Sequence, residues 1–192
     1  MKVRDFIKIY KEDALIQTIA ERIKPNETAH LRLKGLVGSL DAVVAAATYQ
    51  INKQTNIFVL HDKEEAAYFH NDLQNLMGEK EVLLFPTSYK RPYQFDETEN
   101  ANILMRAEIL NRINHKASTG ELIVTYPEAL TEKVINKKAL SSNTFSAKVG
   151  EQLDVAFLSE LLLTYDFEKN DFVYEAGQFS VRGGILDVFS YA

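Results

Sequence analysis

The sequence predicts an α/β protein: a parallel sheet with helices on its faces, followed by a small α+β domain. Apolar strand-like runs alternate with helix-like segments up to Tyr126, which is the pattern of strands joined by crossover helices. From Pro127 onward a helix is followed by alternating strands instead. The 192-residue length accommodates two small domains, so we expect one over residues 1–126 and another over residues 127–192.

The first domain is predicted from periodicity and from the residues that end each element. Phe6–Ile23 carries apolar residues near helical spacing, and Asn56–Leu60 is a continuous apolar run typical of a parallel strand buried on both faces. Asp62 can cap a helix that stops at Gly78. The other predicted strands are His30–Leu33, Glu81–Phe85 and Glu121–Thr125, and the helices are Asp41–Asn52, Lys63–Met77 and Thr98–Asn114.

The second domain is predicted to combine short helices with antiparallel strands. The predicted helices are Pro127–Ile135 and Leu153–Leu163, the latter capped by Asp154. The predicted strands are Thr144–Val149, Tyr165–Tyr174 and Gln178–Phe189, with Gly177 and Gly183-Gly184 at turns or bulges. Because the chain stops at Ala192 directly after an apolar strand, we expect it to be a fragment of a longer protein.

Composition excludes several classes of site. The chain has no cysteine, so disulfides and thiolate chemistry are absent, and its four histidines have no zinc-motif spacing. No signal peptide or membrane-length apolar run is present, which predicts a cytoplasmic protein. Residues 1–126 carry 16 basic and 17 acidic residues, and residues 127–192 carry 6 and 10. This lack of basic excess disfavours DNA binding and favours a protein partner for the acidic C-terminal part.

The segment Leu31–Ala47 has the layout of a P-loop, with an apolar strand, a glycine turn and an alanine-rich helix. Gly35, Gly38 and Ser39 keep the turn, but Leu40 stands at the last glycine, Asp41 at the phosphate-binding lysine and Ala42 at the magnesium ligand. An aspartate repels triphosphate and alanine cannot bind a metal, so the loop is predicted to be degenerate and to bind no cofactor. The alternative is an ordinary βα turn with no nucleotide-binding relative.

Four motifs, in order, carry a family resemblance. They are Gly35-Leu-Val-Gly-Ser39, Leu84-Phe-Pro86 with Arg91-Pro-Tyr93, Ile123-Val-Thr125 with Pro127-Glu-Ala-Leu130, and Gly177-Gln-Phe-Ser-Val-Arg-Gly-Gly-Ile-Leu-Asp-Val-Phe189. Together they resemble the N-terminal region of bacterial transcription-repair coupling factors, which is similar to the first two domains of the excision-repair helicase subunit UvrB. The resemblance implies a P-loop-derived, RecA-like and UvrB-like first domain.

Two departures separate the chain from the helicase subunit. The P-loop is degenerate, and Thr87–Glu97 is too short for the DNA-clamping β-hairpin of that family. The resemblance therefore implies a non-catalytic copy that recruits the repair protein UvrA to stalled RNA polymerase. In the longer protein, C-terminal domains would supply an ATP- and magnesium-dependent DNA motor, contacts to RNA polymerase and DNA, and a surface that masks this region.

The resemblance also implies partner-binding residues. Arg182 matches a UvrA-contacting arginine, and Lys169 is a weaker candidate at a second basic position; Phe179, on the opposite pleat from Arg182, is predicted to be core. An arginine before a glycine turn can grip a carboxylate with two hydrogen bonds. The alternative is a solvated strand arginine with no partner.

Other residues have simpler interpretations. The acidic cluster after Leu60 fits a helix cap better than a metal site, and Arg91 and Tyr93 fit a surface loop better than a nucleic-acid contact. No catalytic residues can be assigned. The rival functions are an active nucleotide-binding helicase domain and a DNA-binding module.

Overall fold

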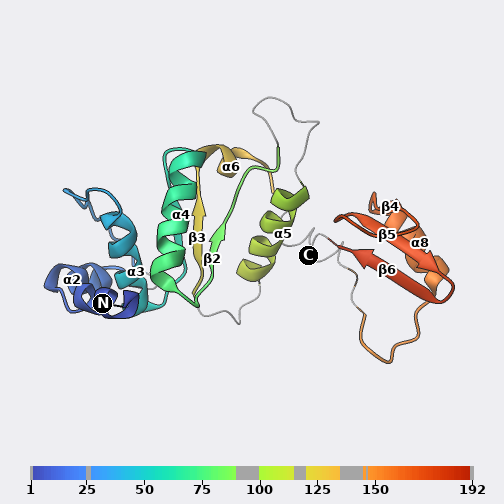
Figure 1. Cartoon of the computed structure of the whole chain (residues 1–192), viewed down its shortest axis with the longest axis horizontal. Coiled ribbons are helices and arrows are strands. Elements are labelled where there is room, and N and C mark those ends of the chain that lie inside the picture. Colours follow the sequence, from blue (N-terminus) through green and yellow to red (C-terminus); the bar gives the residue numbers. More distant parts are fainter. Residues whose placement is uncertain are drawn as a thin grey trace. The chain divides into compact units, whose positions relative to one another are not determined.

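The structure, a computed structural model, describes residues 2–24, 27–89, 100–114, 120–134, 145 and 147–190 (Figure 1). The chain forms two compact units. The first comprises Met1–Pro86 with His115–Thr131, and the second comprises Thr87–Asn114 with Glu132–Ala192. The domain boundary between residues 126 and 127 stays a prediction. The α/β class is confirmed, since a parallel sheet is followed by a small mixed sheet.

The sheet of the first unit has three parallel strands in the order β1-β3-β2. They are β1 (Asn56–Val59), β2 (Val82–Leu84) and β3 (Leu122–Thr125). β3 is central, and all four of its residues are buried, as expected for a strand with neighbours on both edges. The short helix α6 (Pro127–Thr131) follows it.

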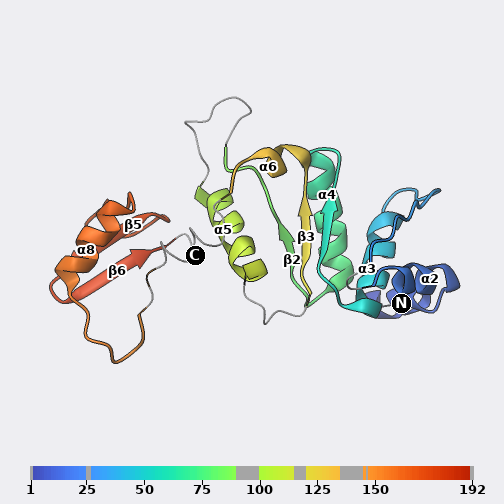
Figure 2. The ribbon, with the colours of Figure 1, turned by 180° about the vertical axis from the view of Figure 1, so that it is seen from behind.

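Helix α4 (Lys63–Met77) packs on β2 and β3, as the views from both sides show (Figures 1 and 2). Both predicted ends are confirmed. The Asp62 carboxylate accepts a hydrogen bond from the backbone N–H of Glu65 at 2.8 Å, and the helix ends at Gly78. This bond is the main cause that lowers the pKa of Asp62 below its ordinary value.

We expect Asp62→Ala to lower the melting temperature by a few degrees, because the first turn of α4 loses its cap. Since the folded-state pKa of Asp62 is lowered, its contribution is complete above the unfolded-state pKa and disappears as pH falls through the folded-state value. Thermal unfolding of both proteins from pH 7 to pH 3 measures this. A difference that grows toward pH 3 would contradict the assignment.

The N-terminal segment predicted as one helix forms two, α1 (Val3–Lys11) and α2 (Ala14–Arg22). Asp13 causes the break, since its carboxylate accepts hydrogen bonds from the backbone of Leu15 and Ile16 and starts a new helix. Both helices pack on α3 (Leu40–Asn52), whose small buried side chains also allow close approach of α4.

The predicted strand His30–Leu33 is wrong, because residues 27–37 form no strand and are exposed. Leu31 and Leu33 alternate with basic residues, which suits a strand face, but no strand among the described residues pairs with the segment. The prediction that the Asn56–Leu60 strand is buried on both faces is also wrong. β1 is an edge strand, and the side chains of Ile57 and Val59 are more than half exposed.

In the second unit, α5 (Asn100–Asn114) carries a buried polar cluster, and residues 98–99 of its predicted range lie outside the described residues. Asn102 donates to the carbonyl of Thr87, and Arg106 pairs with the Glu132 carboxylate at 3.4 Å. The same carboxylate accepts from the hydroxyl and backbone N–H of Ser88. These bonds join α5 to residues 87–88 and 132 within the unit.

The small sheet has the order β4-β5-β6, with β4 (Glu168–Lys169), β5 (Gln178–Arg182) and β6 (Ile185–Phe189). Helix α8 (Val155–Thr164), capped by Asp154 as predicted, packs on β4 and β5. The pair β5–β6 is antiparallel as predicted, but β4 and β5 are parallel. The loop of residues 170–177 carries the chain back to the start of β4, so the antiparallel prediction is wrong for this pair.

The strand predicted at Thr144–Val149 falls partly outside the described residues. Phe145 and residues 147–149, which are described, form no strand, and Val149-Gly150 is a turn. The helix predicted over Pro127–Ile135 is shorter than expected, because α6 ends at Thr131 and residues 132–134 are not helical. Residue 135 lies outside the described part.

Candidate partner-binding surface

Arg182 is the last residue of β5 and is half exposed. It lies opposite Ile185 across the turn Gly183-Gly184. Gly183 has φ +62°, a backbone conformation that favours glycine, so the chain reverses immediately after Arg182. The turn therefore places the arginine at the exposed end of the hairpin.

The guanidinium of Arg182 interacts with Asp187 and Phe172. Its Nη2 donates to the Oδ2 of Asp187 on β6, and its central carbon lies 5.2 Å from the ring centroid of Phe172. Both contacts are at the surface, because the side chains of Asp187 and Phe172 are 41% and 55% exposed. An exposed ion pair and an exposed cation–π contact each contribute about 1 kcal/mol or less to folding, so they orient the side chain more than they stabilise the fold.

The loop that carries Phe172 is tied to β5 at two points. The buried Ser180 hydroxyl donates to the carbonyl of Asp171 at 2.8 Å. The Gln178 side-chain oxygen accepts from the backbone N–H groups of Tyr174 and Glu175 at 3.0 and 3.2 Å. These bonds hold Phe172 beside Arg182, and the Tyr174 ring lies 6.4 Å from that of Phe172. The position of the loop relative to β5 is thus fixed by hydrogen bonds.

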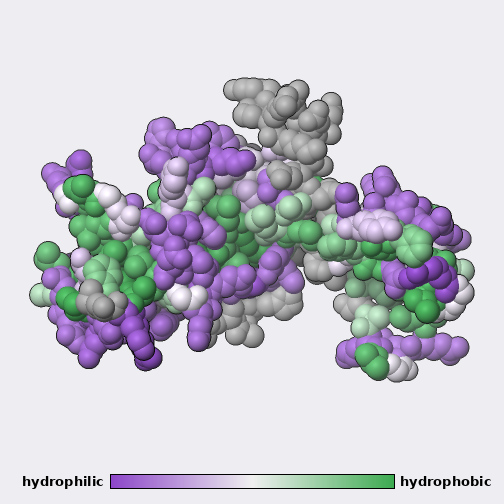
Figure 3. All heavy atoms as spheres, viewed as in Figure 1, coloured by the Kyte–Doolittle hydropathy of each residue, from purple (hydrophilic) through white to green (hydrophobic). Residues whose placement is uncertain are grey.

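Large apolar side chains are exposed on the same face of the hairpin as Arg182. Because paired residues of an antiparallel ladder share a face, Ile185 and Phe189 lie on the same face of the hairpin as Arg182, and both are exposed. Tyr174 is 77% exposed. In Figure 3, green apolar atoms lie at the surface among purple ones in the part that carries the small sheet. We call Phe172, Tyr174, Arg182 and Asp187 the arginine–aromatic cluster.

Lys169 lies apart from this cluster. Its position on β4 is in register with Phe179 of β5, so the two residues belong to the face opposite Arg182. Phe179 is fully buried, as predicted for a core residue, whereas Lys169 is exposed. The structure therefore does not bring the two predicted partner-binding residues onto one face.

The segment predicted to be a degenerate P-loop is an exposed turn before α3. Gly35 and Gly38 have φ +81° and +59°, and Ser39 precedes the helix without a side-chain capping bond. The Asp41 carboxylate accepts from the backbone N–H of Ala42 at 2.7 Å, and Ala42 is fully buried. A negative charge thus occupies a helix N-terminus, where a phosphate would bind in a working loop.

Within the described residues, no group of three or more acidic or histidine side chains is placed to hold a metal ion. None of the helices that the structure describes combines the length and the apolar character needed to cross a membrane.

Comparison with known proteins shows what the chain is similar to. The family model described as the UvrB interaction domain matches residues 145–192, which include α8, the small sheet and the whole arginine–aromatic cluster. The chain is 27% identical over 158 residues to the transcription-repair-coupling factor of Bacillus subtilis (strain 168). The chain is therefore a region like the N-terminal region of transcription-repair coupling factors and of UvrB.

UvrB proteins align with nearly the whole chain. The UvrABC system protein B of Streptococcus thermophilus (strain CNRZ 1066) is 23% identical over 185 residues, and that of Enterococcus faecalis (strain ATCC 700802 / V583) is 21% identical over 188 residues. These alignments cover 91% and 93% of this chain, and that with the coupling factor covers 82%. The chain spans 13% of the coupling factor's length and 27% and 28% of these two UvrB proteins.

Sequence reasoning singled out Arg182 but missed its neighbours. Phe172 and Tyr174 fell inside a predicted strand, where their alternation did not distinguish core from surface. Asp187 was noted as part of the C-terminal motif, but its contact with Arg182 depends on the β5–β6 register. If Gly183-Gly184 is taken as a two-residue turn, the register of the hairpin follows from it. Ser180 is then paired with Asp187, which puts the carboxylate near Arg182.

Proposed function

We propose that this chain is a docking module that recruits UvrA to a stalled RNA polymerase, as part of a longer transcription-repair coupling factor. The observation that carries the proposal is the exposed Arg182, held beside Phe172 at the end of a hairpin inside the segment that matches the UvrB interaction domain. Arginine and exposed aromatic residues are enriched among the residues that dominate binding energy at protein interfaces.

The module is non-catalytic in this proposal. Asp41 occupies the lysine position of the P-loop and bonds to the first turn of α3, and the buried Ala42 offers no metal ligand. ATP hydrolysis and the contacts to DNA and RNA polymerase then belong to other domains of the longer protein. Those C-terminal domains also mask this surface until transcription stalls, and equal UvrA affinity of this chain and the intact protein would contradict that masking.

The test is a binding titration of the chain with purified UvrA beside Arg182→Ala. Removing a charge-assisted contact is expected to weaken binding roughly 10-fold or more. Lys169→Ala, which alters a cation on the other face of the sheet, is expected to have a smaller effect. Circular dichroism checks that both variants are folded. Failure of the wild-type chain to bind UvrA would contradict the proposal.

The rival function, an active nucleotide-binding domain, makes the opposite prediction for ATP. We expect millimolar ATP with magnesium to leave the melting temperature unchanged, because the Asp41 carboxylate repels phosphate at the start of α3. Thermal unfolding with and without the nucleotide measures this. A clear rise that depends on nucleotide concentration would favour the rival and contradict the non-catalytic assignment.

A further inference from the structure

The hydrogen-bonding capacity of Arg182 is only partly used. Among the described residues, Asp187 takes one hydrogen of Nη2, and neither Nε nor Nη1 has an acceptor. The central carbon of the guanidinium lies over the Phe172 ring, 5.2 Å from its centroid. Asp187 and Phe172 therefore both hold the group, and its Nε and Nη1 donors are left unused by the described residues.

The shape of a guanidinium determines what those donors can bind. A carboxylate can be gripped with two hydrogen bonds either by Nε with Nη2 or by Nη1 with Nη2, and each arrangement uses a different hydrogen of Nη2. Asp187 takes one of these hydrogens, so one of the two edges remains complete. A second carboxylate can therefore bind in two-bond geometry without displacing Asp187.

We propose that Phe172 and Asp187 are positioning residues that hold the Arg182 guanidinium for a single carboxylate side chain of the protein partner. This inference rests on the proposed function, since it names the chemistry of the same docking surface. Phe172 sets the plane of the guanidinium, Asp187 fixes one edge, and the partner's aspartate or glutamate binds the other edge. Tyr174, beside Phe172, offers an exposed aromatic surface next to that carboxylate.

The fixed orientation also explains how an exposed arginine can bind one partner carboxylate selectively. Ordering a flexible side chain on binding costs about 0.5–1.5 kcal/mol, and a guanidinium already held by two neighbours avoids part of that cost. Lysine could not replace it, because an ammonium on a flexible stem lacks the planar pair of donors.

Asp187 has a second effect that makes the charge of the partner testable. Its carboxylate repels the incoming one, so the bound arrangement places two negative groups on one guanidinium. Asparagine would keep an oxygen acceptor for Nη2 while removing the negative charge. We therefore expect Asp187→Asn to tighten UvrA binding about threefold, with a steeper loss of affinity as salt is added. Weaker binding by this variant would mean that the negative charge of Asp187 favours the partner, and it would overturn the carboxylate assignment.

The positioning role of Phe172 is tested by a double-mutant cycle in UvrA titrations. Phe172→Leu keeps an apolar side chain but removes the aromatic face, and we expect about threefold weaker binding in the wild-type background. In the Arg182→Ala background the same change should have no effect, because there is no guanidinium to hold. Equal weakening in both backgrounds would mean that Phe172 contacts the partner directly, and it would overturn the positioning role.

Two further variants complete the experiment. Arg182→Lys should lose nearly as much affinity as Arg182→Ala, and wild-type affinity in that variant would overturn the two-bond grip. Phe157→Leu is the matched control, because Phe157 on α8 is 56% exposed, against 55% for Phe172, and should bind UvrA as the wild type does. If the wild-type chain fails to bind UvrA, both the proposed function and this inference are wrong. If the wild-type chain binds UvrA and Arg182→Ala weakens binding, but the effect of Phe172→Leu is the same in both backgrounds, only this inference is wrong.

Discussion

Gly120→Ala is expected to destabilise the first unit strongly, although it adds only one methyl group. A Cβ at residue 120 would lie 2.3 Å from the backbone carbonyl carbon of Gln54 and 2.4 Å from the carbonyl oxygen of Lys53. Both neighbours are backbone atoms, so no side-chain rotation can relieve the overlap. The structure must move either β3 or the turn after α3.

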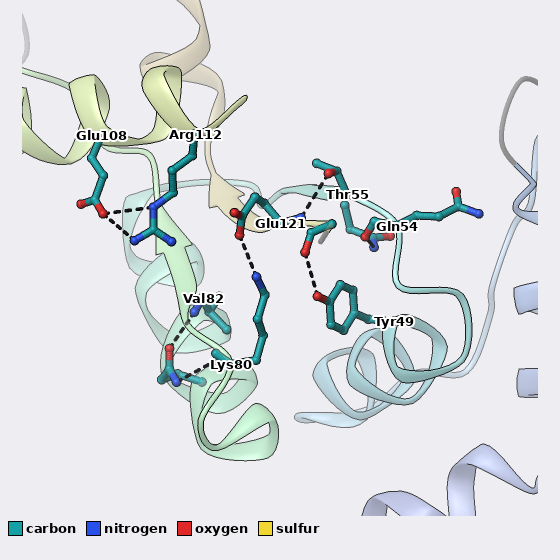
Figure 4. Close-up of polar contacts among 11 residues, drawn as sticks. Tyr49, Gln54, Thr55, Lys80, Val82, Glu108, Arg112 and Glu121 are labelled. Atoms are coloured by element: carbon teal, nitrogen blue, oxygen red, sulfur yellow. Dashed lines mark hydrogen bonds and ion pairs between the residues drawn. The ribbon is translucent and has the colours of Figure 1, made fainter. Parts of the chain in front are cut away.

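The surroundings of Gly120 make that movement costly. The Tyr49 hydroxyl donates to the Gly120 carbonyl at 2.7 Å. The next residue, Glu121, pairs with Lys80 at 2.8 Å (Figure 4). The carbonyl of Glu121 also accepts a hydrogen bond from the backbone N–H of Asn56. Shifting residue 120 therefore disturbs contacts with α3, β1 and the turn before β2 together. We expect a loss of about 3 kcal/mol in the free energy of unfolding, at the upper end for overpacking.

Thermal unfolding measures the effect, and a loss of this size lowers the melting temperature by roughly 10 °C in a unit of this length. Gly184→Ala is the matched control, because a Cβ there meets nothing within 4 Å and its φ is not in the left-handed region. The control should melt within about 2 °C of the wild type. A Gly120→Ala protein as stable as the control would contradict the close backbone approach.

The sequence predicted local structure best where the signal is local. Helix α4 has both predicted ends, because Asp62 bonds to a backbone group three residues away and Gly78 ends the helix by its own conformation. The cap at Asp154 was predicted for the same reason. The break at Asp13 carried the same signal, an acid that can cap a new helix, but the apolar periodicity on both sides of it concealed the boundary.

Strand predictions failed where the answer depends on distant partners. Alternation in His30–Leu33 indicates two unlike faces, but it does not supply a neighbouring strand, and in the part of the chain that the structure describes none pairs with the segment. The apolar run at β1 predicted a buried strand, although only one of its edges is paired. The direction of β4 was missed similarly, because it depends on the path of residues 170–177.

The candidate surface shows the same division. The motif around Arg182 and the resemblance it carries were sufficient to predict the position of the arginine and the core role of Phe179. The contacts to Phe172 and Asp187 require the loop to be tied at Gln178 and Ser180 and β6 to be in register, and neither follows from spacing alone. The partner-binding role of Arg182 therefore stays a prediction, and the structure adds the residues that orient its side chain.

Phe179→Ala is expected to abolish UvrA binding in the proposed docking function without touching the exposed surface. Phe179 is fully buried, and it alternates with Ser180 on β5, so its ring supports the sheet from the face opposite Arg182. Truncating a buried phenylalanine to alanine costs about 3–5 kcal/mol through lost burial and the cavity left behind. A small sheet of three short strands cannot absorb that loss and stay ordered.

The loss of binding in this variant should accompany loss of structure, and this distinguishes it from Arg182→Ala. We expect Phe179→Ala to lose near-ultraviolet dichroism and the second unit to melt early, while Arg182→Ala keeps the wild-type spectrum and melting temperature. Phe157→Ala, which removes an exposed ring from α8, should change the free energy of unfolding by about 0.5 kcal/mol or less. If Phe179→Ala stayed folded and bound UvrA normally, the surface that carries Arg182 would not depend on the core beneath β5.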